Sequence, residues 1–119
     1  MKYQALSILS RVDMSKVRAG KASELSPGKM MGLDVQGKKI LLANVGGRFY
    51  AMDGLCSHMA GHLWEGKLVG TTVKCPRHGS EFDVTTGKNL KGPWLPFSKA
   101  FDQKTYPVSL DGEDLYLEI

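Results

Sequence analysis

The amino-acid sequence predicts an all-β fold built from antiparallel sheets. Turn-forming glycine and proline residues recur at short intervals, so no apolar stretch is long enough for a helix of several turns. The segments between these turns are short and rich in Val, Ile, Leu, Phe and Tyr, which favour strands. Two of the turns have the glycine content of tight hairpins, and hairpins connect antiparallel strands.

Seven strands are predicted in chain order. They cover residues 31–35, 39–44, 48–52, 71–74, 81–84, 105–110 and 115–119. The hairpin turns are Val35-Gln36-Gly37-Lys38 and Val45-Gly46-Gly47-Arg48, because glycine supplies the positive φ that a tight turn between twisted strands requires. Residues 1–14 show no clear period and are expected to form an N-terminal extension, either an edge strand or a loose arm.

Length and composition indicate one globular domain over residues 1–119. The chain is 42% hydrophobic and 24% charged, which excludes a disordered or collagen-like protein. The longest strongly apolar run is Ile40-Leu41-Leu42-Ala43, far shorter than the roughly 20 residues that cross a bilayer. We therefore expect a soluble protein without a membrane segment, and a monomer when free of its partners.

The charge distribution does not favour nucleic-acid binding. The net charge is +4, and residues 1–40 hold eight basic and three acidic residues. The lysines are scattered singly, whereas a nucleic-acid-binding protein is expected to show a dense basic stripe interleaved with aromatic residues. We interpret the excess of positive charge as a solvated surface.

Two short units contain the residues that can bind a metal. They are Cys56-Ser57-His58 and Cys75-Pro76-Arg77-His78, with sixteen residues between His58 and Cys75. The chain has only two Cys and three His, so the pairing of each Cys with a nearby His is improbable by chance. Each unit lies in a loop between predicted strands, and neighbouring glycines let backbone N–H groups approach an anion. The pattern predicts two metal-holding loops.

These four residues allow three interpretations. In the first, the Cys residues are small buried hydrophobes and the His residues are satisfied polar groups. In the second, all four hold a structural zinc ion, although zinc modules usually pair Cys with Cys and His with His along the chain. In the third, each loop spans a two-iron centre, with its Cys on one iron and its His on the other. The arrangement of one thiolate and one imidazole in each loop favours the third.

With this pattern the chain resembles the Rieske iron–sulfur proteins. The resemblance covers roughly residues 15–119 and includes the segments Tyr50-Ala51-Met52-Asp53, Glu65-Gly66-Lys67-Leu68 and the run from Cys75 to Asp83. It implies one Rieske-type [2Fe–2S] cluster, with Cys56 and Cys75 on one iron and His58 and His78 on the other. It also implies stacked antiparallel sheets in which a small cluster-binding subdomain, about residues 53–93, is inserted into a β base.

The ligand set and the residues around it predict a reduction potential above that of a plant-type ferredoxin but below that of the high-potential Rieske proteins. Two ferric ions, two sulfides and two thiolates sum to zero charge, so the cluster should accept an electron more readily than one held by four thiolates. High-potential Rieske proteins carry an additional Cys in each loop, and here Gly61 and Arg77 stand at those places. Ser80 matches a Ser that reaches the cluster in those proteins, but Phe82 replaces a Tyr. We expect a potential below about +200 mV.

The predicted cluster indicates electron transfer and not catalysis. Irons that are saturated by protein and sulfide ligands leave no position for a substrate, so we expect a carrier and not an enzyme. The resemblance implies that the chain passes single electrons from a flavin-containing NAD(P)H reductase to the terminal oxygenase of an aromatic-ring hydroxylating system. The alternative is a small subunit of a larger oxidoreductase such as nitrite reductase. Metal-bound thiolates need a reducing compartment, so we expect the cytoplasm.

Several neighbours of the two loops depart from the family pattern. His62 is expected to be an exposed loop residue and not a ligand; the alternative is a titrating group near the cluster or a partner contact. Trp64 and Trp94 are expected to pack beneath the loops as core residues, and the alternative is that they shield the cluster or form a docking surface. Gly92-Pro93 resembles the family's third loop, which covers the cluster. The segment from Trp94 to Lys104 is several residues longer than expected for the family.

Overall fold

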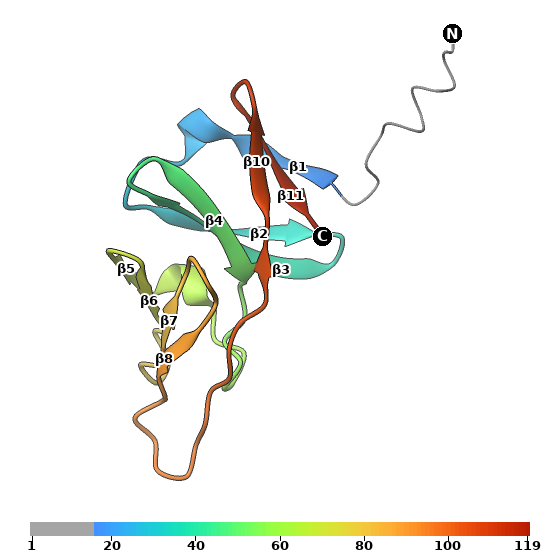
Figure 1. The fold of residues 1–119 in the computed structure, drawn as a ribbon. Helices are drawn as coiled ribbons and strands as arrows, with labels where there is room; N and C mark the ends of the chain where they lie inside the picture. The colour runs from blue at the N-terminus through green and yellow to red at the C-terminus, as the bar shows by residue number, and fades with distance from the viewer. Residues whose placement is uncertain (1–15) are drawn as a thin grey trace, which may run out of the picture.

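The computed structural model describes residues 16–119, and the predicted extension at residues 1–14 lies outside the described residues. The described chain forms three antiparallel sheets, ordered β1-β11-β10, β2-β3-β4-β9 and β5-β6-β7-β8 (Figure 1). The strands are β1 (Lys16–Lys21), β2 (Met30–Val35), β3 (Lys38–Val45), β4 (Arg48–Asp53), β5 (Lys67–Val69), β6 (Thr72–Lys74), β7 (Glu81–Asp83), β8 (Asn89–Lys91), β9 (Thr105–Tyr106), β10 (Val108–Asp111) and β11 (Asp114–Glu118). Two single-turn 3₁₀ helices, η1 (Ala22–Glu24) and η2 (Leu63–Glu65), complete the described part. The predicted all-β, antiparallel class is confirmed.

The two predicted hairpins join β2 to β3 and β3 to β4. Gln36 and Gly37 have φ values of 52° and 82°, and Gly46 and Gly47 have φ values of 60° and 96°. Positive φ at both central residues gives a turn whose twist matches that of the flanking strands. These turns fix the register of the central sheet, which pairs Val35 with Lys38.

The predicted single strand over residues 105–110 is wrong. The chain there forms two strands, β9 and β10, which are separated by Pro107. Proline has no backbone N–H to donate to a ladder, so a continuous strand is interrupted at this point. β9 pairs with β4 in the central sheet, whereas β10 pairs with β11 in the first sheet, so the chain changes sheets at Pro107.

Strand β3 is buried on both of its faces. Its side chains at Leu41 and Ala43 join one core, and those at Ile40 and Leu42 join the other. The first core also contains Val73 and other residues of the β5–β8 half, whereas the second is closed by residues of β11. The central sheet therefore lies between the other two sheets, which explains the uninterrupted apolar run in the sequence.

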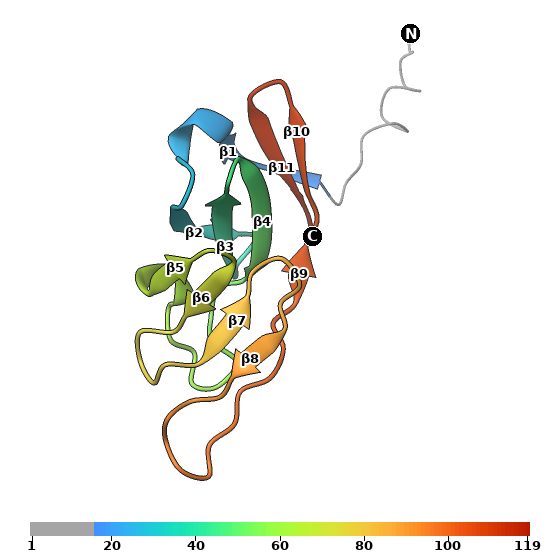
Figure 2. The same cartoon turned by 60° about the vertical axis from the view of Figure 1, so that its left-hand side comes forward.

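The β5–β8 sheet forms the end of the molecule opposite β1, β10 and β11. Figures 1 and 2 show this sheet in yellow to orange below the central sheet, with the segment between β8 and β9 running past it to form the lower tip. The loops that carry the two Cys–His units lie before β5 and between β6 and β7. Within residues 16–119, no helix is long and apolar enough to cross a membrane.

Candidate metal centre

The two Cys–His loops have the same backbone hydrogen bonds. In each, the Cys N–H donates to the carbonyl five residues later, from Cys56 to Gly61 at 2.8 Å and from Cys75 to Ser80 at 2.8 Å. In each, the N–H four residues after the Cys donates back to the Cys carbonyl, at 2.8 Å for Ala60 and 3.1 Å for Gly79. Ala60 and Gly79 both have positive φ, at 55° and 78°. Two separate stretches of chain thus form matching turns, each closed on its own Cys.

The four side chains lie in two pairs at different depths. Cys56 and Cys75 are both 4% exposed, carry free thiols and belong to the same core. The His58 and His78 rings lie closer to the surface, with their centroids 5.1 Å apart and their planes at 75°. The structure therefore brings the two thiols together in the core and the two imidazole rings together nearer the surface.

The electrostatic environment of the thiols suits a metal. Burial raises the pKa of the Cys56 thiol, and the neighbouring Cys75 raises it further, while the backbone N–H groups of His58 and Met59 lower it. Ionising two adjacent buried thiols has a high free-energy cost unless a positive charge lies between them. Metal ions supply that charge and deprotonate the thiols that bind them.

Two buried polar atoms fit a group that contains both a metal ion and a hydrogen-bond acceptor. His78 Nδ1 and Ser80 Oγ are buried and have no hydrogen-bond partner within residues 16–119. A buried polar atom without a partner costs about 1–3 kcal/mol. An imidazole nitrogen can bind iron and a hydroxyl can donate to a sulfide, so an iron–sulfur cluster at this place would satisfy both atoms.

Arg77 connects the two loops. Its Nη1 donates to the carbonyl of Met59 at 2.9 Å. A Cβ atom added to Gly61 would lie 2.9 Å from the side-chain carbons of Arg77, so these two positions are adjacent. The resemblance to Rieske proteins implies additional cysteines at these two positions in the high-potential members, and in this chain a hydrogen bond connects the two loops.

Gln103 lies in the segment before β9 and connects this segment to the first Cys–His loop. The sequence analysis did not identify it. This buried side chain donates from Nε2 to the carbonyls of Asp53 at 3.0 Å and Leu55 at 2.8 Å. Its Oε1 accepts from the N–H of Ser57 at 2.9 Å. No local pattern in the sequence marks this residue, since its partners lie 46 to 50 positions away.

The neighbouring aromatic residues have different roles. His62 is exposed, stacks on Trp64 with a centroid distance of 4.5 Å and lies 3.3 Å from Glu65, so it belongs to a separate group of side chains. Trp64 packs against the core, as predicted. The prediction that Trp94 is a core residue is wrong, because it is 69% exposed and contacts the His78 ring edge-on at a centroid distance of 5.5 Å.

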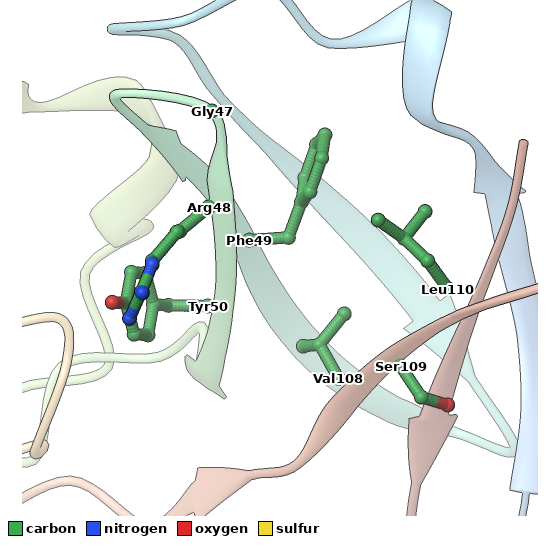
Figure 3. Close-up of a pocket in the computed structure, with 7 residues that line it drawn as sticks. All are labelled: Gly47, Arg48, Phe49, Tyr50, Val108, Ser109 and Leu110. Atoms are coloured by element: carbon green, nitrogen blue, oxygen red, sulfur yellow. The ribbon is translucent and has the colours of Figure 1, made fainter.

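A hollow at the other end of the molecule has none of this chemistry. It lies between β4 and β10, has a volume of about 320 Å³, and is shown in Figure 3 with its lining residues Gly47, Arg48, Phe49, Tyr50, Val108, Ser109 and Leu110. It contains no Cys, His or carboxylate, and apolar side chains from both strands project into it (Figure 3). The metal centre is therefore not at this hollow.

Comparison with known proteins decides among the three interpretations. A family model described as the Rieske [2Fe–2S] domain matches residues 15–107. The chain belongs to the Rieske [2Fe–2S] domain family. This Rieske domain carries a single [2Fe–2S] cluster, so the structural-zinc interpretation and the interpretation without metal are both wrong.

The similar proteins are ferredoxins. The chain is 36% identical over 96 residues to the ferredoxin component of a naphthalene 1,2-dioxygenase system of Pseudomonas aeruginosa, an alignment that covers 81% of this chain and 88% of the relative. It is 40% identical over 96 residues to the ferredoxin component of naphthalene 1,2-dioxygenase/salicylate 5-hydroxylase systems of a Ralstonia species, with the same coverage. This Rieske domain is accordingly an electron carrier and not a catalytic enzyme, and these relatives do not support the nitrite reductase alternative.

Solved structures agree on the fold. The ferredoxin of carbazole 1,9a-dioxygenase from Nocardioides aromaticivorans IC177 is similar, with a TM-score of 0.78 and 30% identity, and the match covers 87% of this chain and 96% of that one. A chain from the complex of reduced oxygenase and oxidized ferredoxin in carbazole 1,9a-dioxygenase matches with a TM-score of 0.80 and 26% identity. That match covers 89% of this chain and 94% of the other. The predicted stacked-sheet Rieske fold is confirmed.

Proposed function

We propose that this Rieske domain is the ferredoxin component of an oxygenase system. It accepts one electron at a time from a flavin-containing NAD(P)H reductase and delivers it to a terminal oxygenase. The observation that carries this proposal is the similarity, over most of both chains, to ferredoxin components of dioxygenase systems. A solved complex of an oxygenase with a ferredoxin gives further support, because its matching chain has the same fold.

The proposal includes the four cluster ligands. Cys56 and Cys75 would bind one iron of the cluster, and His58 and His78 would bind the other. The close pairing of the two buried thiols and the 5.1 Å separation of the imidazole rings support this assignment. When bound, the cluster supplies one-electron redox chemistry: it can accept one electron and release it again. The partly exposed imidazoles offer a short path for that electron to a docked partner.

The other residues of the site hold the ligands in place. The matching backbone turns set the direction of each Cys, and Arg77 and Gln103 fix the first loop to the second loop and to the returning chain. The hydroxyl of Ser80 is buried without a partner within residues 16–119, and it would donate a hydrogen bond to a cluster sulfur. Such hydrogen bonds tune the potential of iron–sulfur centres.

We also propose the division and location of the protein. Residues 1–119 form a single domain, with about residues 53–93 as its cluster-binding subdomain, and the protein works in the cytoplasm. The β5–β8 sheet and both Cys–His loops lie within residues 53–93, which supports the division. Thiolates that must stay free of oxidation need a reducing compartment, which supports the location.

The ligand assignment is tested by spectroscopy of substituted proteins. The variants H58A and H78A are purified with iron and sulfide and reduced with dithionite, and electron paramagnetic resonance is recorded. We expect each to lose the cluster or change its signal strongly, whereas the matched control H62A keeps the signal of the native protein. A native signal from H58A or H78A would disprove the assignment.

The carrier role is tested by reconstituting electron flow. The reductase and terminal oxygenase of a naphthalene 1,2-dioxygenase system are mixed with NADH and naphthalene, without their own ferredoxin. We expect product formation to depend on addition of this chain and to cease with H78A. The proposal is wrong if the loaded chain accepts electrons from the reductase but the oxygenase is never reduced.

A further inference from the structure

A groove beside the second Cys–His loop gathers positive charge next to His78. It has a volume of about 350 Å³, and its lining includes Glu65, Lys67, Lys74, Arg77, Gly79 and Trp94. We name it the Trp94 groove. The only carboxylate in its lining, that of Glu65, lies 3.3 Å from His62. The lysines and the arginine of the groove therefore give it a net positive charge.

The sheet register places these lysines opposite one another. Lys67 pairs with Lys74 across β5 and β6, Lys74 pairs with Glu81 across β6 and β7, and Glu81 pairs with Lys91 across β7 and β8. Like charges directly opposite each other destabilise a sheet. Within residues 16–119, neither Lys67 nor Lys74 forms an ion pair with a carboxylate. The row holds three positive charges against one negative charge, so an external anionic group would relieve the repulsion.

An exposed aromatic ring stands beside these charges. Trp94 is 69% exposed, and its backbone N–H donates to the backbone carbonyl of His78 at 2.9 Å. A Cβ atom added to Gly79 would lie 3.3 Å from the indole and 3.5 Å from the Lys74 side chain, so both side chains border the same glycine. Tryptophan and arginine are among the residue types that most often contribute the binding energy of a protein–protein interface.

We propose that the Trp94 groove docks an acidic segment of the terminal oxygenase. Carboxylates of that segment pair with Lys67 and Lys74, and an apolar side chain of the segment packs on Trp94. The inference rests on the proposed function, since it requires an oxygenase partner. Because the groove adjoins His78, docking brings the acceptor to the imidazole edge, where the reduced cluster loses one electron and the acceptor gains it.

Binding measurements test the docking site. Oxidised, cluster-loaded protein is titrated into the terminal oxygenase of a naphthalene 1,2-dioxygenase system at low ionic strength, and Kd is measured by calorimetry. We expect K67E/K74E to weaken the complex roughly tenfold. W94A should weaken it by at least a similar factor. The control K16E/K21E changes the net charge equally on the distant strand β1, and it should bind like the native protein.

A small anionic oxidant tests the charge of the groove without any partner. Ferricyanide takes one electron from the reduced cluster and becomes ferrocyanide, and its rate is followed by stopped-flow absorbance. At low ionic strength K67E/K74E should react roughly tenfold more slowly than K16E/K21E, and added salt should reduce the difference. The midpoint potential of each variant is measured as well, so that a change in driving force is not mistaken for a change in local charge.

The outcomes distinguish a failure of the groove from a failure of the function. If the native protein neither binds nor reduces the oxygenase, the proposed function is wrong and the docking site falls with it. If the native protein does both but K67E/K74E binds as tightly as K16E/K21E, the function stands and the groove is not the docking site. Equal ferricyanide rates for the two double variants, or native binding by W94A, would also overturn the proposal.

Discussion

At the scale of single residues, the hydroxyl of Ser80 is expected to raise the reduction potential. Ser80 is fully buried, and within the described chain its Oγ has no partner. A hydrogen bond to a charged acceptor strengthens when the cluster gains an electron. Losing about 1.4 kcal/mol of this stabilisation in S80A should lower the potential by about 60 mV, as voltammetry can measure. The exposed Ser109 provides the control S109A, and equal potentials for the two variants would refute this role.

Arg77 is expected to stabilise the two loops against each other. Replacing it in R77M removes the hydrogen bond to the Met59 carbonyl but keeps much of the aliphatic stem. The free energy of unfolding should fall by about 1 kcal/mol, and a chelator should remove iron faster. R48M, which changes another exposed arginine, should leave both quantities unchanged. A variant R77M as stable as R48M would show that the hydrogen bond contributes nothing.

The sequence identified the candidate ligands more readily than the residues that support them. Cys56, His58, Cys75 and His78 stand out because rare residue types recur at short spacing, a signal that needs no knowledge of the fold. Gln103 and Arg77 act through contacts across the folded chain, with partners 18 to 50 positions away. Trp94 was misjudged for a related reason, since the path of the long segment before β9 decides whether its ring is covered.

At the scale of the elements, the ring of Trp64 attaches η2 to the central sheet. The ring lies directly over Gly32 of β2, and a Cβ atom added to Gly54 would lie 2.8 Å from it. In G32A the added methyl group overlaps the indole, so we expect a loss of about 1–3 kcal/mol in the free energy of unfolding, measured with urea. G92A is the matched control, because Gly92 has open space around it. The added substitution W64F should recover part of the loss in G32A.

The contact between β9 and the end of β4 is expected to depend on pH. Burial, together with a hydrogen bond of 2.6 Å to Asp53, raises the pKa of Tyr106 to about 12. A tyrosine in the unfolded chain titrates near pH 10. The higher pKa of Tyr106 in the folded protein therefore stabilises the fold below about pH 10, and this contribution is lost as the pH rises towards 12. Y106F should therefore be less stable at about pH 8 and lose less stability than the native protein between about pH 9 and 11.

Urea unfolding at several pH values measures this difference. Y50F serves as the control, because it removes a hydroxyl from the same sheet without removing the hydrogen bond to Asp53. The Tyr106 contribution would be refuted if Y106F and the native protein lost stability in parallel over the alkaline range.

Elements with strong apolar patterns were predicted well, and polar or very short ones were not. The strands β2, β3 and β4 were predicted to within one residue at each end, because apolar runs and glycine turns bound them. β1, β5 and β8 were missed, since β1 has Val17 as its one large apolar residue and β5 and β8 are only three residues long. The division of residues 105–111 into β9 and β10 depends on the sheet with which each strand pairs. This pairing is a property of the tertiary structure, and Pro107 is its one sign in the sequence.

At the scale of the whole molecule, the two halves depend on the cluster to different degrees. The core between the central and first sheets is composed of ordinary aliphatic and aromatic side chains. The other core includes Cys56 and Cys75, and the loops that carry these residues have few backbone hydrogen bonds besides their own turns. Strand β3 contributes to both cores, so it connects a half whose core has no cysteine to a half whose core includes the two free thiols.

Removal of the cluster should therefore unfold one half locally. Without iron, the buried thiols and His78 Nδ1 lose the group that fits them, so local opening costs less free energy there than in the other half. We expect amide hydrogen exchange, followed by mass spectrometry, to accelerate over residues 54–104 in the apo-protein and to stay slow in β3, β4 and β11. Reloading iron and sulfide should restore protection, which separates local opening from irreversible damage. Uniform acceleration over all three sheets would instead mean that the two cores unfold as one cooperative unit.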